Sequence, residues 1–144
     1  MIEGKWIKPG EDLSEALPIR EAVMNASQDS LDEKAWNAVI CLQGKPAAAG
    51  RIWWAQGAFW IGNVCVLPKA RGQGLGDLMV RLLLFKAQEH GARRVCLTAP
   101  GGLIPFFARY GFQEKESLGG EESRLMELSG EKISLGGCGN GYSA

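Results

Sequence analysis

The stretch of sequence that most constrains this chain is ARGQGLGDLM, residues 70–79, because it separates two different hydrophobic patterns. The run before it, IGNVCVLP, is typical of a strand, whereas the apolar residues after it recur at helical spacing: Leu75, Leu78, Met79, Leu82 and Leu83. The first backbone N–H groups of a helix lack partners within the helix and lie at the positive end of its dipole. Glycines also let an anion approach without meeting a Cβ atom. The stretch therefore predicts a strand, a phosphate-binding loop built on Gly72, Gly74 and Gly76, and a helix.

The glycine spacing alone does not say which phosphate this loop would bind. RGQGLG is followed by no Lys-Ser or Lys-Thr, so it is not a P-loop, and its glycines recur at every second position, unlike GxGxxG. A glycine-rich turn that binds no ligand remains the alternative.

Composition and charge exclude several classes of protein. A chain of 144 residues with 46% hydrophobic residues predicts one domain with a substantial core. The 16 basic and 16 acidic residues balance, which argues against a nucleic-acid-binding protein. No apolar run approaches the roughly 20 residues that cross a bilayer, and MIEGKWIKPGED lacks the features of a secretory signal. We therefore expect a soluble, cytoplasmic protein that does not bind membranes.

The four cysteines indicate buried thiols rather than a metal site. Cys41, Cys65 and Cys96 lie inside apolar runs, and no CxxC pair supports a zinc site. Cys138 lies in the glycine-rich sequence GGCGNGYSA, where we expect an exposed thiol on a poorly ordered tail.

The N-terminal half predicts a strand, two helices and a three-stranded antiparallel meander. The strand covers residues 4–8, and a helix covers 11–24 with Pro18 kinking or splitting it. A second short helix over 30–35 has Ser30 as its N-cap. Apolar runs separated by glycine-containing turns predict strands over 36–42, 46–54 and 58–67.

The C-terminal half continues with mixed elements. The helix from Leu75 ends before Gly91. A strand over 94–99 that is covered on both faces, a short helix over 103–110 and an antiparallel pair over 112–117 and 123–129 follow. We expect one domain over residues 1–129 and a poorly ordered glycine-rich tail over 130–144.

Two motifs resemble the GCN5-related N-acetyltransferase (GNAT) family. VCVLPKARGQGLG before an amphipathic helix is similar to the family's acetyl-CoA motif, with Arg71, Gly74 and Gly76 at its defining positions. The later block VCLTAPGGLIPFFARYGF is similar to the family's downstream strand, helix and Gly-Phe, here Gly111-Phe112. The resemblance implies an α+β fold: a mixed, mostly antiparallel sheet of about six to seven strands with helices on both faces and a splayed central strand pair.

The resemblance also implies how acetyl-CoA would bind. The backbones of Val64, Cys65 and Val66 would bond the pantetheine amides, and a main-chain N–H in this bend would polarise the thioester carbonyl. The pyrophosphate would lie on backbone groups of six consecutive residues: Gly72, Gln73, Gly74, Leu75, Gly76 and Asp77. No metal and no covalent enzyme intermediate are implied.

Two positions depart from the family pattern. Phe107 occupies the position where many members carry a tyrosine that protonates the leaving thiolate, and a phenyl ring has no proton to give. Phe107 would either face the cofactor or pack in the core. Tyr110, water or another hydroxyl would supply the proton, or the thiolate would leave unaided. Asp77 replaces a basic or hydroxyl residue, and we expect its side chain to turn to solvent.

The general base stays unassigned among several candidates. An amine near neutral pH must lose a proton before it attacks, and Glu33, Asp32 or a water held by Asn63 could take that proton. Each is also readily explained as an ordinary structural or surface residue. His90 precedes Gly91 and is explained as a residue near the end of a helix.

Four aromatic residues flank one hairpin: Trp53, Trp54, Phe59 and Trp60. Strand alternation turns one member of each pair away from the core. The outward members would line the acceptor pocket or contact a second copy in a homodimer, and packing beneath helices is the alternative.

The function that the resemblance implies is acetyl transfer from acetyl-CoA to a primary amine of a small molecule or peptide. FFARYGF is also similar to members that acetylate the α-amine of glutamate, for which Arg20 and Arg51 would bind the carboxylates. Other hypotheses are a non-catalytic acyl-CoA sensor, which Phe107 favours, and a partner-binding module that uses the tryptophans.

Overall fold

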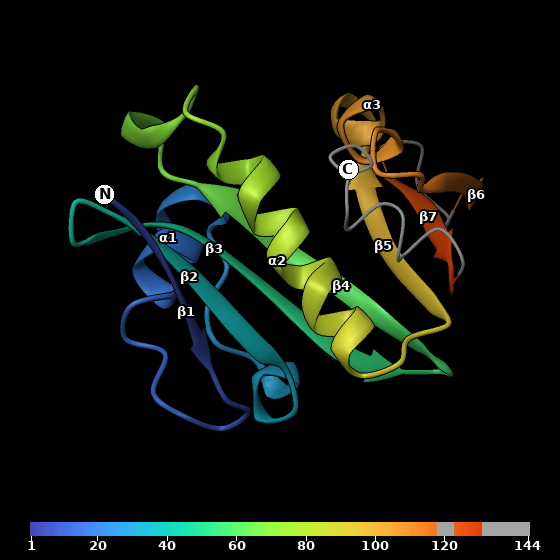
Figure 1. Ribbon diagram of the computed structural model, residues 1–144, viewed down its shortest axis with the longest axis horizontal. Coiled ribbons are helices and arrows are strands. Elements are labelled where there is room, and N and C mark those ends of the chain that lie inside the picture. The colour runs from blue at the N-terminus through green and yellow to red at the C-terminus, as the bar shows by residue number, and fades with distance from the viewer. Residues whose placement is uncertain (118–122, 131–144) are drawn as a thin grey trace. The chain divides into compact units, whose positions relative to one another are not determined.

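Seven strands form one mixed sheet in the computed structural model, which describes residues 1–117 and 123–130. The strands are β1 (Ile2–Ile7), β2 (Trp36–Leu42), β3 (Lys45–Ala55), β4 (Ala58–Val66), β5 (Arg94–Pro100), β6 (Gln113–Ser117) and β7 (Ser123–Ser129). Their order in the sheet is β1-β2-β3-β4-β5-β7-β6 (Figure 1). The β4–β5 pair is parallel, whereas β1–β2, β2–β3, β5–β7 and β6–β7 are antiparallel. This confirms the predicted mixed and mostly antiparallel sheet.

Three α-helices and three short 3-10 turns connect these strands within the described residues. The helices are α1 (Leu17–Met24), α2 (Leu75–Glu89) and α3 (Ile104–Ala108). The 3-10 turns are η1 (Ser30–Glu33), η2 (Pro68–Ala70) and η3 (Gly101–Leu103). None of these helices is both long and apolar enough to cross a bilayer.

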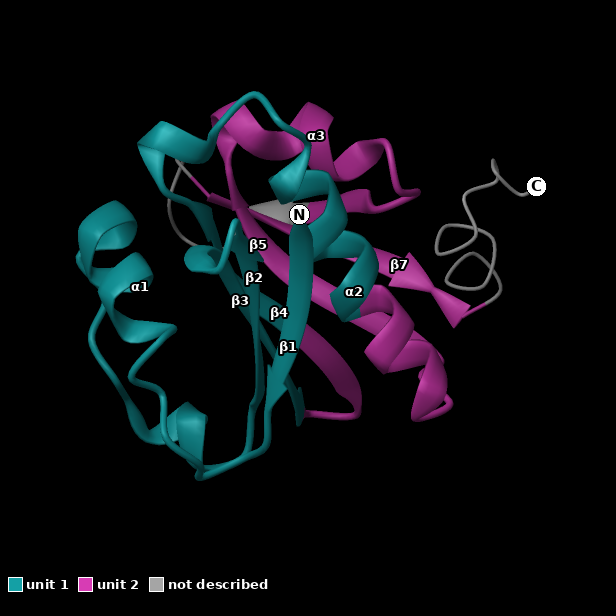
Figure 2. Cartoon of the chain, turned by 60° about the vertical axis from the view of Figure 1, so that its left-hand side comes forward, with its two compact units in different colours: residues 1–54, 61–83 teal, residues 55–60, 84–144 magenta. Residues whose placement is uncertain are grey.

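The chain divides into two compact units, residues 1–54 with 61–83 and residues 55–60 with 84–144 (Figure 2). In the first unit, the core residues Leu13, Ala16 and Ile19 cluster with Val39, Cys41, Ala49 and Cys65. The segment around α1 therefore covers one face of β2, β3 and β4. Gly50 points to the opposite face, because a Cβ atom there would lie 2.9 Å from Met79 and 3.0 Å from Leu83. The first half of α2 covers that face, and the closeness of its side chains explains the glycine in β3.

The second unit is built around β5. This strand pairs with β7 over its whole length, from Arg94↔Ser129 to Pro100↔Ser123. On its other edge it pairs with β4 at Phe59↔Val95 and Trp60↔Cys96, the start of both strands. Buried side chains of this unit include Leu84, Ala87, Val95, Leu97, Met126 and Leu128.

Several sequence predictions need correction at their ends. The helix predicted over 11–24 is helical only over Leu17–Met24, because Pro18 fits the first turn, where its missing N–H is not needed. The helix predicted over 30–35 is the 3-10 turn η1, and its N-cap is Asp29 rather than Ser30. Asp29 and Asp32 form a reciprocal capping box there. The helix predicted over 103–110 is likewise shorter, Ile104–Ala108 after the turn η3.

Other predictions agree closely with the structure. β2 has the predicted bounds, and α2 begins at the predicted Leu75. Cys41, Cys65 and Cys96 are buried free thiols, as predicted. The predictions for the tail and for Cys138 lie outside the described residues.

Candidate active site

The loop between β4 and α2 has the geometry of an anion cradle. Gly72 and Gly74 both adopt a φ of +81°, and no atom lies within 4 Å of the position that a Cβ atom would take at either residue. Arg71 donates its backbone N–H to Pro68, at 3.3 Å, and the N–H of Leu78 donates to the Gly74 carbonyl, at 3.0 Å. Between them, and among the described residues, the backbone N–H groups of residues 72–76 donate to no acceptor in the protein. The loop thus combines open space with unused donors at the positive end of a helix.

The side chains that flank this loop turn away from its amides. Arg71 donates from Nε to the Val66 carbonyl oxygen, at 3.0 Å. Asp77 accepts from Arg81 Nε at 3.0 Å, one helical turn along α2. Asp77 therefore lies along the helix in an ion pair, with its side chain 35% exposed.

The strand before the loop contains a bend at Asn63. This residue has a φ of +52°, a left-handed conformation that is uncommon for residues other than glycine. At Gly62, a Cβ atom would lie 3.0 Å from the Trp53 ring, so the indole lies directly over the backbone at this bend. Cys65 follows two residues later, and burial raises the pKa of its thiol to about 11. A thiol in that state is a poor nucleophile near neutral pH, so Cys65 does not fit a covalent role.

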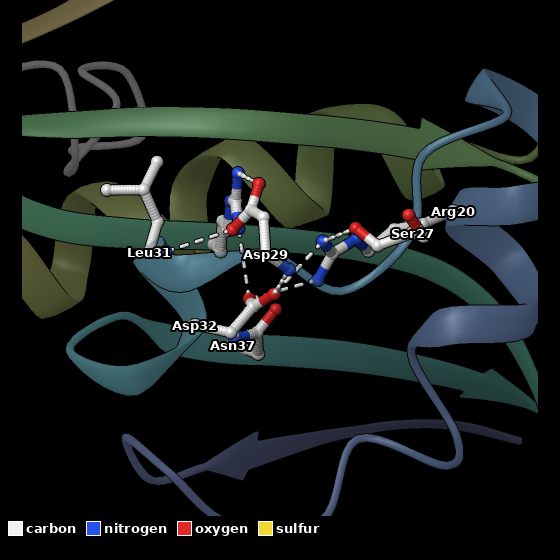
Figure 3. Close-up of polar contacts among 7 residues, drawn as sticks. Arg20, Ser27, Asp29, Leu31, Asp32 and Asn37 are labelled. Atoms are coloured by element: carbon white, nitrogen blue, oxygen red, sulfur yellow. Dashed lines mark hydrogen bonds and ion pairs between the residues drawn. The ribbon is translucent and has the colours of Figure 1, made fainter.

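A buried network of charges lies in the same unit as the bend, and Figure 3 shows the side chains that form it. We call it the Arg–Asp network and define it by Arg20, Asp29, Asp32, Asn37 and Arg51. Arg20 donates to both carboxylate oxygens of Asp32, at 3.1 and 3.2 Å, and from Nη2 to the Ser27 carbonyl, at 3.0 Å. Arg51 donates from Nη1 to Asp32, at 3.0 Å, and from Nη1 and Nη2 to Asp29, at 2.7 and 3.0 Å. Asn37 adds a hydrogen bond from Nδ2 to Asp32 at 3.3 Å.

The two carboxylates of the network are held ionised. Burial alone raises the pKa of Asp32, but hydrogen bonds from Arg20, the Asp29 amide and Arg51 outweigh it and lower the pKa to about 2. The hydrogen bond from Arg51 likewise lowers the pKa of Asp29. A general base needs a pKa near the working pH, so this environment argues against Asp32 as the base. Glu33 is exposed on η1, and its proposed role as a base remains a prediction.

The side chain of Asn63 joins the same network. With its amide oriented so that the oxygen faces the guanidinium groups, it accepts from Arg51 Nε at 3.2 Å and from Arg20 Nε at 3.3 Å. The oxygen is thereby shared between two arginines, which does not fit the prediction that Asn63 holds a catalytic water through this atom.

The aromatic residues of α3 form a packed group in the second unit. Phe107 is buried and makes edge contacts with Phe106 and Phe112, at ring-centroid distances of 4.9 and 6.1 Å. Tyr110 is also buried, and its hydroxyl lies 3.5 Å from Arg109 Nη2. Phe107 thus has the contacts of a packed ring, which was one of the two alternatives at this position.

The pair Trp53 and Trp54 follows the predicted alternation, whereas Phe59 and Trp60 are both half-buried. Trp54 is 53% exposed, whereas Trp53 is half-buried with the Arg51 guanidinium 5.2 Å from its ring centre. Trp60 donates from its indole nitrogen to the Ala55 carbonyl at 3.0 Å. The Phe59 ring lies 5.9 Å from that of His90, so this histidine has an aromatic contact near the end of α2.

Sequence reasoning did not find the Arg–Asp network, although two signals pointed to it. Arg20 lies on the apolar stripe of its helix, and Arg51 interrupts the apolar strand PAAAGRIWW. A charged residue at a core position needs a buried partner of opposite charge, but the sequence does not identify that partner. Within the described residues, no three His, Cys, Asp or Glu side chains gather in a way that could hold a metal ion.

Comparisons with known proteins agree with this geometry. The family model described as an acetyltransferase (GNAT) domain matches residues 33–114. A Bacillus subtilis (strain 168) protein described as the uncharacterized N-acetyltransferase YjcF is 30% identical, with 77% of this chain and 87% of that protein covered. The solved structure of an acyl-CoA N-acyltransferase from Pseudomonas aeruginosa has a TM-score of 0.80 at 23% identity, covering 90% of this chain and 100% of that one. A GNAT family acetyltransferase from Elizabethkingia anophelis with acetyl-CoA bound has a TM-score of 0.72 at 12% identity, covering 89% and 97%.

Proposed function

Because the chain belongs to the GNAT acetyltransferase family, we propose that it transfers the acetyl group of acetyl-CoA to a primary amine of a small molecule or a peptide. The observation that carries this proposal is the loop between β4 and α2. Among the described residues, its amides from Gly72 to Gly76 have no acceptor, and open space lies at the Cβ positions of Gly72 and Gly74. A diphosphate supplies the negative oxygens that such a set of donors binds.

The residues present fit the cofactor that the family uses. The amides of residues 72–77 would hold the pyrophosphate, and the backbones of Val64, Cys65 and Val66 would bond the pantetheine arm. Arg71 already donates to the Val66 carbonyl at 3.0 Å, so that oxygen has one lone pair left for an amide of the arm. When bound, acetyl-CoA supplies a thioester whose carbonyl carbon accepts the amine.

The protein's own contribution is position and electrostatics. The bend at Asn63 would direct a backbone N–H of the segment 64–66 towards the thioester oxygen, where it would stabilise developing negative charge. The buried Cys65 thiol, with its raised pKa, takes no part as a nucleophile, so the amine attacks directly. The proton that the leaving thiolate needs does not come from Phe107, which leaves Tyr110 or water as its source.

We favour an acceptor amine that the protein does not need to recognise through carboxylate groups. Acetylation of an amino acid such as glutamate needs free cationic groups, and Arg20 and Arg51 were the candidates. Both are buried and paired with Asp29 and Asp32, so their charge is already compensated. This pairing disfavours the glutamate-like alternative.

A non-catalytic acyl-CoA-binding domain is the second candidate function, and the packed Phe107 ring favours it. One experiment separates the two: titration calorimetry with acetyl-CoA, followed by an assay of free thiol release over a broad panel of amines. Binding with amine-dependent thiol release would support the transferase. Binding without release would support the sensor, and the absence of any binding would contradict both.

A further inference from the structure

Asn63 is held in a costly backbone conformation within a strand. Its φ of +52° lies in the left-handed region, where a Cβ atom crowds the following carbonyl oxygen, a cost that asparagine bears more readily than most other residues with a side chain. Such a conformation persists only when the surrounding structure determines it. The neighbour Gly62 could have adopted it without this cost, yet the bend lies at the asparagine. The side chain of Asn63 is therefore the place to look for what holds the bend.

The contacts of that side chain are charge-assisted and rigidly supported. Its oxygen accepts from Arg51 Nε at 3.2 Å and from Arg20 Nε at 3.3 Å. Hydrogen bonds from a charged donor are stronger than neutral ones. The outer nitrogens of both arginines are bonded to Asp29, Asp32 and the Ser27 carbonyl. These bonds leave each planar guanidinium little freedom to rotate, so the two Nε–H groups define one position for the Asn63 oxygen.

These contacts also limit what Asn63 can do chemically. An amide oxygen has two lone pairs, and two guanidinium donors use both. The remaining amide nitrogen donates and does not accept. Asn63 therefore cannot take the proton of an incoming amine, directly or through a water on its oxygen.

We propose that Asn63 is a positioning residue: the Arg–Asp network holds its side chain, and through it fixes the direction of the backbone N–H groups that follow in residues 64–66. The inference rests on the proposed function, in which one of those N–H groups stabilises the thioester oxygen. It adds that the buried charges of Arg20, Arg51 and Asp32, together with the more exposed Asp29, act on the reaction through the position of Asn63. The bend is thus set by side chains from α1, η1 and β3, rather than by the sequence of β4 alone.

The test compares three chains: Asn63→Gly, Asn63→Asp and the control Gln43→Gly. Glycine keeps the left-handed backbone but loses the anchor, whereas aspartate keeps an oxygen for both guanidinium groups. Gln43 also has a positive φ, of 55°, but lies in the turn between β2 and β3, away from the network. Each variant is checked for folding by circular dichroism, and then two quantities are measured: the kcat and KM for the amine, and hydrogen exchange of the Val64–Val66 amides in the protein without ligand.

For Asn63→Gly we expect kcat to fall about tenfold to a hundredfold, with KM and the affinity for CoA changed less than about threefold, because an aimed donor acts mainly in the transition state. Exchange of the Val64–Val66 amides should accelerate by at least about tenfold. Asn63→Asp should restore both quantities to within about threefold of the wild type, and Gln43→Gly should change neither.

If Asn63→Gly kept the kcat and the Val64–Val66 exchange rates of the wild type, the proposal would be overturned. The bend would then need only a residue that tolerates a positive φ, and not the side chain of Asn63. A loss of kcat in Asn63→Asp as large as in Asn63→Gly would also overturn it. The exchange measurement needs no substrate. If the wild-type protein acetylates no amine, the proposed function fails while exchange still decides whether Asn63 anchors the bend.

Discussion

The loop at residues 71–77 and the Arg–Asp network lie in the same unit but are built in opposite ways. The loop offers backbone donors, open space and glycines whose Cβ positions meet nothing. The network consists of side chains, almost fully buried at Arg20 and Asp32, whose charged groups bond one another. The loop can bind a ligand because it leaves space and unused N–H donors, whereas the network is stable because each of its charged groups is paired with one of opposite charge. Substitutions in the loop should therefore affect binding more than stability, and substitutions in the network should affect stability first.

The largest effect should follow removal of the carboxylate at the centre of the network. Asp32→Ala leaves two buried guanidinium groups without their shared partner, and breaking a buried ion pair costs about 3–5 kcal/mol. We expect the free energy of unfolding in urea to fall by about that amount. Glu15→Ala is the control, because it removes an exposed ion pair with Lys5 and should change the stability much less. Equal losses of unfolding free energy in Asp32→Ala and Glu15→Ala would contradict the view that the network contributes more to stability than an exposed ion pair.

The next effect concerns the loop. Gly74→Val places a side chain in the space that the pyrophosphate would occupy, so we expect the dissociation constant of CoA to rise about a hundredfold, or about 3 kcal/mol. Gly44→Val is a matched control, since Gly44 also has a positive φ, of 82°, and no atom within 4 Å of its Cβ position. Titration calorimetry should show weakened binding only for Gly74→Val, while denaturation should show similar losses of stability for both. Unchanged affinity in Gly74→Val would refute the cradle.

A smaller effect is expected from the pH dependence of stability, to which the network contributes through Asp32. The folded pKa of Asp32, about 2, lies below its ordinary value of 3.8. The group therefore contributes stability that is complete above the ordinary value and is lost as pH falls towards the folded value. That shift corresponds to about 2 kcal/mol. We expect urea unfolding to show this loss between about pH 5 and about pH 2 in the wild type, and a flatter profile in Asp32→Asn. Parallel profiles for both would contradict the assignment.

The smallest effect should come from Phe107→Tyr. The ring is packed against Phe106 and Phe112, and the added hydroxyl must find space in that group. If protonation of the thiolate limits turnover, kcat should rise by no more than about tenfold, and stability should fall by less than about 2 kcal/mol. A large loss of activity with unchanged CoA affinity would show that the ring serves packing alone.

The comparison also explains which parts the sequence could predict. The loop and β2 are local patterns, set by glycine spacing and by a short apolar run, so they were predicted with their correct positions. The network joins Arg20, Asp32 and Arg51 from three separated elements, and no local pattern specifies that meeting. The bounds of α1 were wrong because the apolar spacing continued through residues that Pro18 excludes from the helix. The conformation of Asn63 was missed because a left-handed residue within a strand depends on contacts distant in sequence.

The most direct test of the central claim is amide hydrogen exchange over residues 72–76, measured with saturating CoA and with saturating pantetheine, which lacks the diphosphate. The account predicts that CoA protects these amides strongly and that pantetheine leaves their exchange unchanged. Saturated CoA binding without protection of residues 72–76 would contradict it.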